Sequence, residues 1–161
     1  MRVLLLRHAS ALPKEENAAR PLSELGKKQA AFTGSAVASM LGAISGKLQI
    51  YHSGKERAAE TASFLEKALV DTGAELVGPT VATDGLSPND EPDSAMELMK
   101  QSADLPFVAF VGHLPFMHNF ASKLLSAAEV SADDFGDAGG LLLEIEGEKI
   151  SVAAKVATCE D

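Results

Sequence analysis

The chain has 161 residues, of which 46% are hydrophobic and 23% charged, so it can bury a globular core without disulfides. Its net charge of −9 argues against nucleic-acid binding, which needs a basic surface, and its one cysteine, Cys159, excludes an internal disulfide or a metal–thiolate site. No apolar run near the start is long enough for a signal peptide or a membrane span. We therefore expect one cytoplasmic domain over residues 1–161, with no nucleic-acid or membrane partner.

The first half of the chain alternates between strand-like and helix-like segments. A short apolar run predicts a buried strand over residues 2–7, and a polar loop over residues 9–20 follows it. Ser23 suits a helix N-cap, and the apolar positions after it predict a helix that ends near Leu41. Another short apolar run predicts a second strand over residues 48–51.

A second helix is predicted directly after this strand. Ser53-Gly54-Lys55-Glu56 matches a capping box, in which the serine hydroxyl and the glutamate carboxylate each bond to the backbone N–H of the other. One face of the helix then carries Ala58, Ala62, Leu65 and Leu69. Arg57 falls in the first turn, just past the end of the preceding strand.

The second half continues the alternation and closes with antiparallel strands. The predicted elements are a weak strand at residues 75–77, a turn-rich loop at 84–91, a helix at 92–101, a strand at 107–111, a helix from Pro115, an acidic loop at 126–138, and a hairpin of strands 140–146 and 149–157. Strands that alternate with helices predict an α/β protein. We expect a three-layer α/β/α sandwich with a mostly parallel sheet.

Charged and imidazole side chains gather where the strands of this predicted sheet end. The first strand ends in Arg7-His8, and the strand over residues 107–111 is followed by Gly112-His113. Ligands of parallel sheets bind beyond the carboxyl ends of the strands. We therefore expect both histidines to share one pocket with Arg7 and Arg57.

Two arginines and two histidines in one pocket fit a phosphoryl group. Arginine binds phosphate oxygens through paired N–H donors, and a neutral imidazole can attack phosphorus. Neighbouring cations disfavour the imidazolium form, so the arginines lower the pKa of the attacking histidine. The same donors neutralise the charge of the transferring group, so we expect neither a metal nor a cofactor.

Four stretches of the sequence resemble the histidine phosphatase superfamily, whose fold is phosphoglycerate mutase-like. Leu6-Arg7-His8-Ala9 resembles its Arg-His motif, with alanine where the family usually has glycine. Residues 53–61 resemble its serine-to-arginine segment, residues 111–113 its Gly-His pair, and residues 20–26 its R-P-L-S-x-x-G segment. Together the matches span nearly the whole chain.

Within the superfamily, the chain most resembles the small SixA-type phosphohistidine phosphatases. The R-P-L-S-x-x-G segment, the short length, the loop over residues 86–91 and the sequence after Gly112 all point there. The resemblance implies that His8 is the nucleophile and becomes phosphorylated, in an open site without the large cap of bigger members. It also implies that the phosphate pocket is completed by Arg7, Arg57 and His113.

Three further residues have two interpretations each. Asp90 and Glu91 lie on the loop where the family carries its proton donor, and Glu91 lines up with the acid of the SixA-type loop. Either residue is a proton donor, or both belong to a solvated loop and helix cap. Arg20 either adds to the rim of the pocket or anchors its own loop.

The remaining histidines and acidic residues have simpler interpretations. His52 precedes the predicted capping serine and His118 lies inside a predicted helix, so both are taken as structural or surface residues. Asp133, Asp134 and Asp137 lack the full calcium-loop pattern and are expected to form a solvated loop.

Three functions fit the sequence. The first is a metal-independent phosphatase that hydrolyses phosphohistidine on a signalling protein through a phospho-His8 intermediate. The second is a small-molecule phosphomonoesterase that uses the same pocket, and the third is a weakly catalytic phosphate-binding or phosphoprotein-docking module. The expected partner is a phosphorylated protein or a small phosphorylated substrate.

Overall fold

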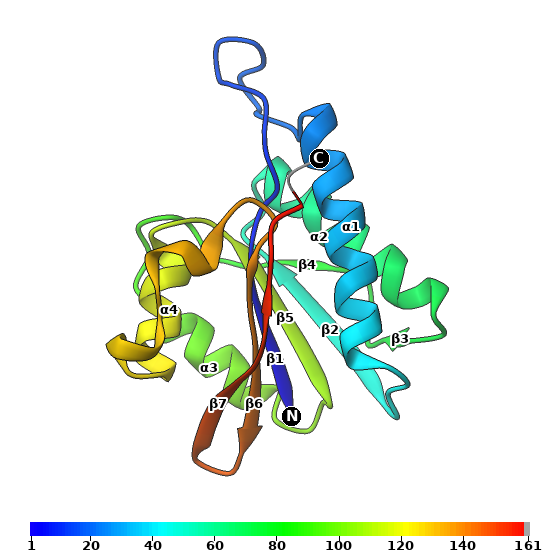
Figure 1. Ribbon diagram of the computed structural model, residues 1–161, viewed down its shortest axis with the longest axis vertical. Helices are drawn as coiled ribbons and strands as arrows, with labels where there is room; N and C mark the ends of the chain where they lie inside the picture. Colours follow the sequence, from blue (N-terminus) through cyan, green and yellow to red (C-terminus); the bar gives the residue numbers. More distant parts are fainter. Residues whose placement is uncertain (160–161) are drawn as a thin grey trace.

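The computed structural model describes residues 1–159, and a seven-stranded sheet lies at their centre (Figure 1). The strands are β1 (Arg2–Arg7), β2 (Lys47–His52), β3 (Glu75–Leu76), β4 (Val81–Ala82), β5 (Phe107–Gly112), β6 (Gly140–Glu146) and β7 (Lys149–Val156). Their order is β3-β2-β5-β1-β6-β7, with β4 paired to β2. The first five strands pair in parallel, whereas β6 and β7 are antiparallel. The predicted mostly parallel sheet with an antiparallel end is confirmed.

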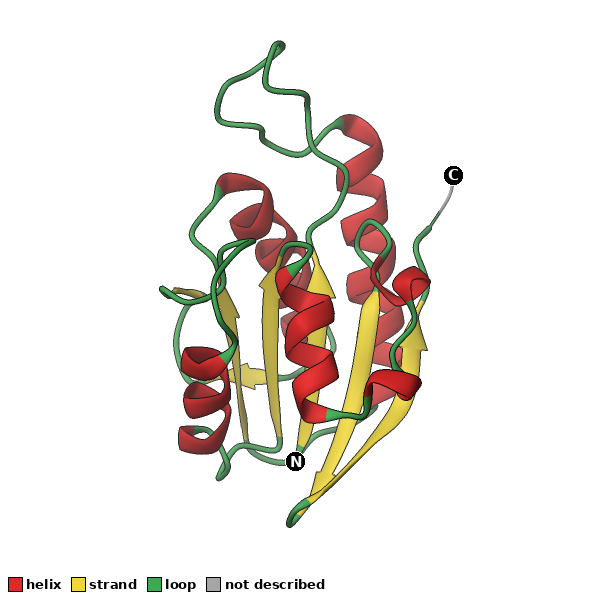
Figure 2. Cartoon of the chain, turned by 90° about the vertical axis from the view of Figure 1, so that its left-hand side faces the viewer, coloured by secondary structure: helices red, strands yellow, loops and turns green. Residues whose placement is uncertain are grey.

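Helices cover both faces of the sheet (Figures 1 and 2). They are α1 (Glu24–Leu41), α2 (Glu56–Asp71), α3 (Asp93–Gln101) and α4 (Phe116–Leu124), with two 3₁₀ helices, η1 (Ala127–Glu129) and η2 (Ala132–Phe135). Helices α1 and α2 lie on one face, and α3 and α4 lie on the other. The predicted three-layer sandwich is confirmed. None of the helices within residues 1–159 combines the length and apolar character that a bilayer crossing requires.

Strand β1 shows how the apolar runs of the sequence build two cores at once. Val3 and Leu5 pack with α3 and α4, whereas Leu4 and Leu6 pack with α1 and α2. All four side chains are fully buried. Because both faces of the sheet are covered, the strand is apolar between its two terminal arginines instead of alternating with polar residues.

Short elements account for most of the differences from the sequence prediction. The loop over residues 126–138, expected to be irregular, contains η1 and η2, and a serine capping box opens each. Strand β4 is not predicted, because a strand of two residues carries no periodicity. Pro92 and Pro115 open the predicted helices from the N-cap instead of the first helical position.

The carboxyl ends of β1, β5 and β2 meet at one edge of the sheet. The register there pairs Arg7 with Gly112 and His52 with Val111. The loop over residues 9–20 projects beyond this edge, at the top of Figures 1 and 2, and an Ala11–Leu22 bridge closes its base. This edge carries the candidate site.

Candidate active site

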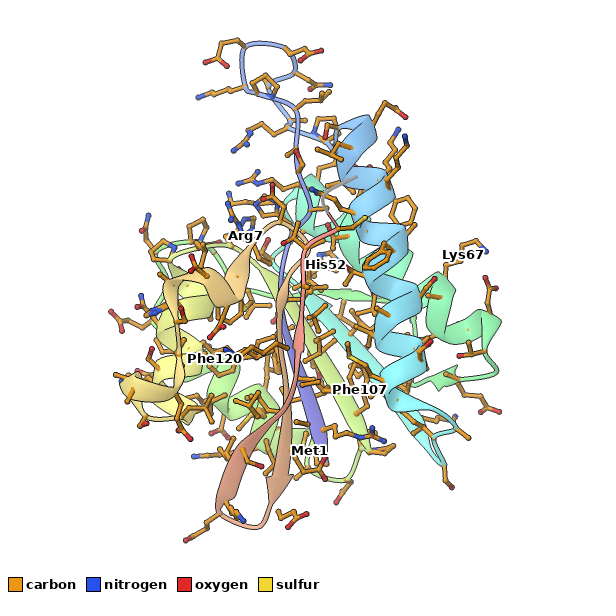
Figure 3. The ribbon with its side chains drawn as sticks, in the orientation of Figure 1. Met1, Arg7, His52, Lys67, Phe107 and Phe120 are labelled. Atoms are coloured by element: carbon orange, nitrogen blue, oxygen red, sulfur yellow. The ribbon has the colours of Figure 1, made fainter. Side chains whose placement is uncertain are left out.

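Three neighbouring parallel strands each deliver one side chain to this edge. His8 directly follows β1, His113 directly follows β5, and Ser53 directly follows β2. The ring centroids of the two histidines lie 5.0 Å apart. Figure 3 places Arg7 and His52, the last residues of β1 and β2, toward this same end of the sheet. The structure therefore brings the two expected histidines together at one edge of the sheet.

His8 is a neutral imidazole with one ring nitrogen bonded to the backbone. The side chain is buried, and its Nδ1 donates to the carbonyl of Ala9 at 2.7 Å. Because a carbonyl only accepts, the ring proton lies on Nδ1 and the lone pair on Nε2. The pKa of His8 is lowered to about 4, chiefly by burial and also by the charges of Arg57 and Arg7. At neutral pH, Nε2 of His8 is therefore free to attack an electrophile.

Ala9 fits without the glycine that the family usually carries. Its side chain is fully buried in a small apolar cluster with Leu22, Ala30 and Ala138. Its backbone N–H donates to Oγ1 of Thr61 at 3.0 Å, which ties the segment to α2. The methyl group of Ala9 therefore contributes to packing, and the carbonyl of Ala9 remains available to His8.

His113 is also buried, with 2% of its surface exposed. Its Nε2 lies 2.6 Å from Oγ of Ser53, whereas its Nδ1 is buried and has no hydrogen-bond partner. The pKa of His113 is lowered to about 3 by burial first, then by His8 and Arg57. The ring is therefore neutral at physiological pH.

The two arginines each present a buried nitrogen without a partner. Arg7 donates from Nη1 to the carbonyl of Phe135 at 3.2 Å, and the same nitrogen lies 3.6 Å from a carboxylate oxygen of Asp137. Nε of Arg7 and Nε of Arg57 are buried and have no hydrogen-bond partner. Burial lowers the pKa of Arg57, and the nearby charge of Arg20 adds to this effect. Arg57 remains cationic all the same, because arginine does not lose its proton in proteins.

These unpartnered nitrogens define the chemistry of the pocket. Within residues 1–159, the buried side-chain N and O atoms without a partner are Nε of Arg7, Nε of Arg57, Nδ1 of His113 and Oγ of Ser122. Three of the four belong to this one site, although buried polar atoms in proteins are almost always hydrogen-bonded. Two guanidinium donors beside a neutral imidazole with a free lone pair suit a tetrahedral oxyanion such as a phosphoryl group.

Arg20 anchors its loop and also lies close to the site. Its Nε donates to the carbonyl of Leu12 at 3.0 Å, and its backbone has a φ of 50°. Its charge is near enough to lower the pKa of Arg57. The contact with Leu12 fits the anchor of its own loop, and a place for Arg20 on the rim of the site stays a prediction.

Asp90 and Glu91 lie on the loop beside the end of β5. A Cβ added to Gly112 would lie 3.2 Å from the carbonyl oxygen of Leu86, so this loop packs against the strand end that precedes the second histidine. Asp90 accepts a hydrogen bond from the backbone N–H of Ser87 at 2.9 Å, whereas Glu91 is exposed. The two residues line an open hollow of about 540 Å³. The described contacts join neither carboxylate to the two histidines.

The structure corrects the capping box predicted at residues 53–56. Helix α2 begins at Glu56 with Lys55 as its N-cap, and no side chain caps it. Gly54 adopts a φ of 89°, and Ser53 lies two residues before the N-cap, too far from the helix to cap it. The Ser53 hydroxyl contacts His113 instead, a role that the sequence reasoning missed although Ser53 lies in a recognised motif.

The structure also corrects the acidic loop at residues 126–138. Asp134, expected to be solvated, is buried and accepts hydrogen bonds from the backbone of Ser131 and from Nζ of Lys155. Asp137 is the second residue whose role the sequence did not predict. Its carboxylate faces Arg7. Nothing in the sequence signals that contact, since it depends on how the loop turns back toward β1.

The other histidines lie outside the pocket. His52 is buried, and its Nδ1 accepts from the backbone N–H of Gly54 at 3.1 Å, so it supports the turn after β2. His118 is half-buried on α4, near enough to Asp134 to help lower the pKa of that carboxyl. In the part of the chain that the structure describes, no group of three His, Cys, Asp or Glu side chains is placed to hold a metal ion.

Comparisons in sequence and in structure give different results. No protein-family model matches the chain, and no curated protein matches its sequence. A protein assigned as the phosphohistidine phosphatase SixA from Agrobacterium tumefaciens has 24% identity and a TM-score of 0.73, over 98% of both chains. The protein histidine phosphatase SixA complexed with tungstate has 16% identity and a TM-score of 0.78, over 98% of this chain and 97% of that one.

A third solved structure is a mycobacterial glucosyl-3-phosphoglycerate phosphatase in complex with VO3, with 18% identity and a TM-score of 0.65, over 98% of this chain and 99% of that one. These likenesses cover almost the full chain, so they define a class of fold: that of the histidine phosphatases. Two of the three neighbours are SixA proteins, the type whose motifs the sequence resembles. The fold expected from the sequence is therefore confirmed.

Proposed function

We propose that the protein is a phosphatase that moves the phosphoryl group of a protein phosphohistidine first to His8 and then to water. One observation carries this proposal: the buried, unpartnered nitrogens of Arg7, Arg57 and His113 gather around a histidine whose lone pair is free. The two neighbours known with tungstate and VO3 support it, because both ligands are oxyanions.

The reaction proceeds in two displacements at phosphorus. In the first, the lone pair on Nε2 of His8 attacks phosphorus, and the bond between phosphorus and the substrate nitrogen breaks. The departing nitrogen keeps the electron pair, takes up one proton and leaves as neutral imidazole. In the second, a water molecule attacks phosphorus and gives one proton to the carboxylate that acted as donor in the first step. The bond to Nε2 of His8 breaks, its electron pair returns to that nitrogen, and inorganic phosphate departs.

The remaining residues stabilise charge and supply a proton. Arg7, Arg57 and His113 bind the three oxygens that do not react, and loss of one such donor costs on the order of 10²–10³ in rate. Asp90 already accepts a hydrogen bond from its own loop, so exposed Glu91 is the proposed proton donor. A departing imidazole depends on that donor less than an alkoxide would.

A small phosphate ester is the second candidate substrate. The likeness to a glucosyl-3-phosphoglycerate phosphatase favours it, because that protein is named for a small-molecule substrate on the same fold. A phosphate-binding or docking module is the third candidate. The signalling role of the substrate, independence from metals and a cytoplasmic location stay predictions from the sequence.

One experiment separates the three candidates. Hydrolysis of a phosphohistidine-bearing protein domain and of an aryl phosphate is measured with the wild type, with His8→Ala and with His118→Ala as the matched control. Faster cleavage of the phosphohistidine, lost only in His8→Ala, supports the proposed function. Faster cleavage of the aryl ester favours the phosphomonoesterase, and phosphate binding without turnover of either substrate favours the module.

A further inference from the structure

Ser53 forms a short hydrogen bond with His113, and the proposed reaction assigns no role to this contact. Its Oγ lies 2.6 Å from Nε2 of His113, and the backbone N–H of Lys55 donates to the same oxygen at 3.3 Å. The contact joins the ends of β2 and β5, which are neighbouring strands far apart in the sequence. It is the contact that occupies the second ring nitrogen of His113.

The turn after β2 fixes the position of this hydroxyl. Gly54 adopts a φ of 89°, which costs glycine nothing, and its N–H donates to Nδ1 of His52 at 3.1 Å. The carbonyl of His52 in turn accepts from the backbone N–H of Thr83 at 2.9 Å. The backbone therefore holds Ser53 in place, and the short serine side chain adds little freedom of its own.

The neutral ring of His113 has one proton to place on two nitrogens. With the hydrogen on Nε2, the buried Nδ1 would turn a lone pair toward the oxygens of a bound phosphoryl group, and the two would repel each other. With the hydrogen on Nδ1, the same atom donates to those oxygens. Lys55 already donates to Oγ of Ser53, so the hydroxyl hydrogen is free to point at Nε2 of His113.

We infer that Ser53 is a positioning residue, whose hydroxyl donates to Nε2 of His113 and thereby keeps the ring proton on Nδ1, facing the phosphoryl oxygens. This inference rests on the proposed function, because it assigns His113 its form within that reaction. His113 then acts as a neutral N–H donor, and its bond strengthens as negative charge builds on the oxygens in the transition state. No covalent bond forms at Ser53, and His113 keeps its proton throughout.

The first test reads the tautomer directly. In ¹⁵N NMR spectra of the full chain, with and without inorganic phosphate, the protonated nitrogen of His113 is distinguished from the unprotonated one. We expect the hydrogen on Nδ1 in the wild type and in Ser53→Thr, which retains the hydroxyl. We expect Ser53→Ala to move the hydrogen toward Nε2, a change that a purely structural role of the serine would not produce.

The second test measures turnover of the phosphohistidine substrate. Ser53→Ala is expected to lower kcat by about tenfold and to change KM by about twofold or less, because the lost bond acts mainly in the transition state. Ser53→Thr is expected to restore most of kcat. Ser63→Ala is the matched control: this exposed serine of α2 donates only to the carbonyl of Ala59 at 3.1 Å.

Two results overturn the inference. One is a wild-type spectrum with the hydrogen on Nε2 of His113, and the other is a Ser53→Ala enzyme with the kcat of the wild type. Failure of the proposed function looks different. In that case the wild type cleaves no phosphohistidine substrate, while the tautomer of His113 is still read in the free protein.

Discussion

Strand β1 carries an arginine at each end, and only one of them lies in a site. At the amino end, Arg2 donates from Nη2 to the carbonyl of Leu41 at 3.4 Å. At the carboxyl end, Arg7 donates to the carbonyl of Phe135 and lies near Asp137, yet its Nε is buried without a partner. Both arginines are half-buried, so burial alone does not distinguish them.

The difference lies in what else reaches each end of the sheet. At the carboxyl end, two histidines and Arg57 converge on Arg7. At the amino end, marked by Met1 in Figure 3, a hollow of about 370 Å³ is lined largely by apolar side chains such as Met99 and Ile150. Parallel strands bring several donors together where they end, so the carboxyl end is where a phosphate ligand is expected.

Replacement of His8, the proposed nucleophile at the carboxyl end of β1, is expected to have the largest effect on turnover. His8→Ala is expected to lower turnover of the phosphohistidine substrate by on the order of 10⁴-fold or more, since no phosphoenzyme can form. The measurement is single-turnover rapid quench with a radiolabelled substrate, which detects the phosphorylated protein. Labelled protein in His8→Ala, in an amount equal to the wild type, would contradict the assignment of the nucleophile.

Substitution of arginines at the two ends of the sheet tests whether these ends differ in function. Arg57→Ala removes a pocket donor and is expected to lower kcat/KM by about 10²–10³-fold. Arg2→Ala, at the other end of β1, is expected to leave kcat/KM within about twofold of the wild type. Steady-state kinetics with both variants decide this, and equal losses would show that position in the sheet does not explain the site.

Acid is expected to lower the free energy of unfolding through His8, at the carboxyl end of β1. The unfolded chain protonates His8 near pH 6.5, whereas the folded chain does so only at about 4. The stabilisation is thus fully present above pH 6.5, and about 3 kcal/mol of it is lost as the pH falls toward 4. Denaturant unfolding at pH 7, 5.5 and 4 measures it, and His8→Gln should show a shallower loss. Identical pH profiles for the two proteins would contradict the assigned pKa shift.

Asp137 should act in the opposite sense to the arginines. Its carboxylate lies 3.6 Å from Nη1 of Arg7 and competes with an anionic ligand for that cation. Asp137→Asn is expected to tighten product inhibition by inorganic phosphate by about two- to fivefold. Asp133→Asn, on an exposed residue of the same loop, is the control. Weaker inhibition in Asp137→Asn would show that the carboxylate mainly holds Arg7 in position.

Chelation should have the smallest effect. In the proposed reaction, the guanidinium groups of Arg7 and Arg57 supply the positive charge that a divalent ion supplies in metal-dependent phosphatases. A chelator such as EDTA is therefore expected to leave kcat unchanged within error, in a steady-state assay with the phosphohistidine substrate. Activity that disappears with chelator and returns with one particular divalent ion would contradict this prediction.

The long apolar elements were predictable from the sequence, and the short ones were not. Strand β5 and residues 3–6 of β1 are continuous apolar runs buried on both faces, so their composition alone predicts these strands. Strand β4 and the helices η1 and η2 have two to four residues, too few to show a period. Their structure comes from capping serines and from pairing with β2, which only the folded chain brings together.

The same distinction holds within the site. His8 and His113 could be expected together, because both follow strands that end at one edge of a parallel sheet. The contacts of Ser53 and Asp137 could not, because they depend on backbone turns: Gly54 has a φ of 89°, and Ala138 has a φ of 52°. Local sequence patterns do not indicate the direction in which such a turn orients the side chain of the residue that precedes it.

The pairing of Arg7 with Gly112 has a consequence for how this protein can change. A one-residue slip of β1 against β5 would displace His8 by about 3.3 Å and send its imidazole to the opposite face of the ladder. An insertion or deletion within these strands would therefore move His8 out of the position that the proposed reaction requires. Adaptation to a new substrate is instead expected in the loops over residues 9–20 and 84–91. The length of these loops can change without altering the register between β1 and β5.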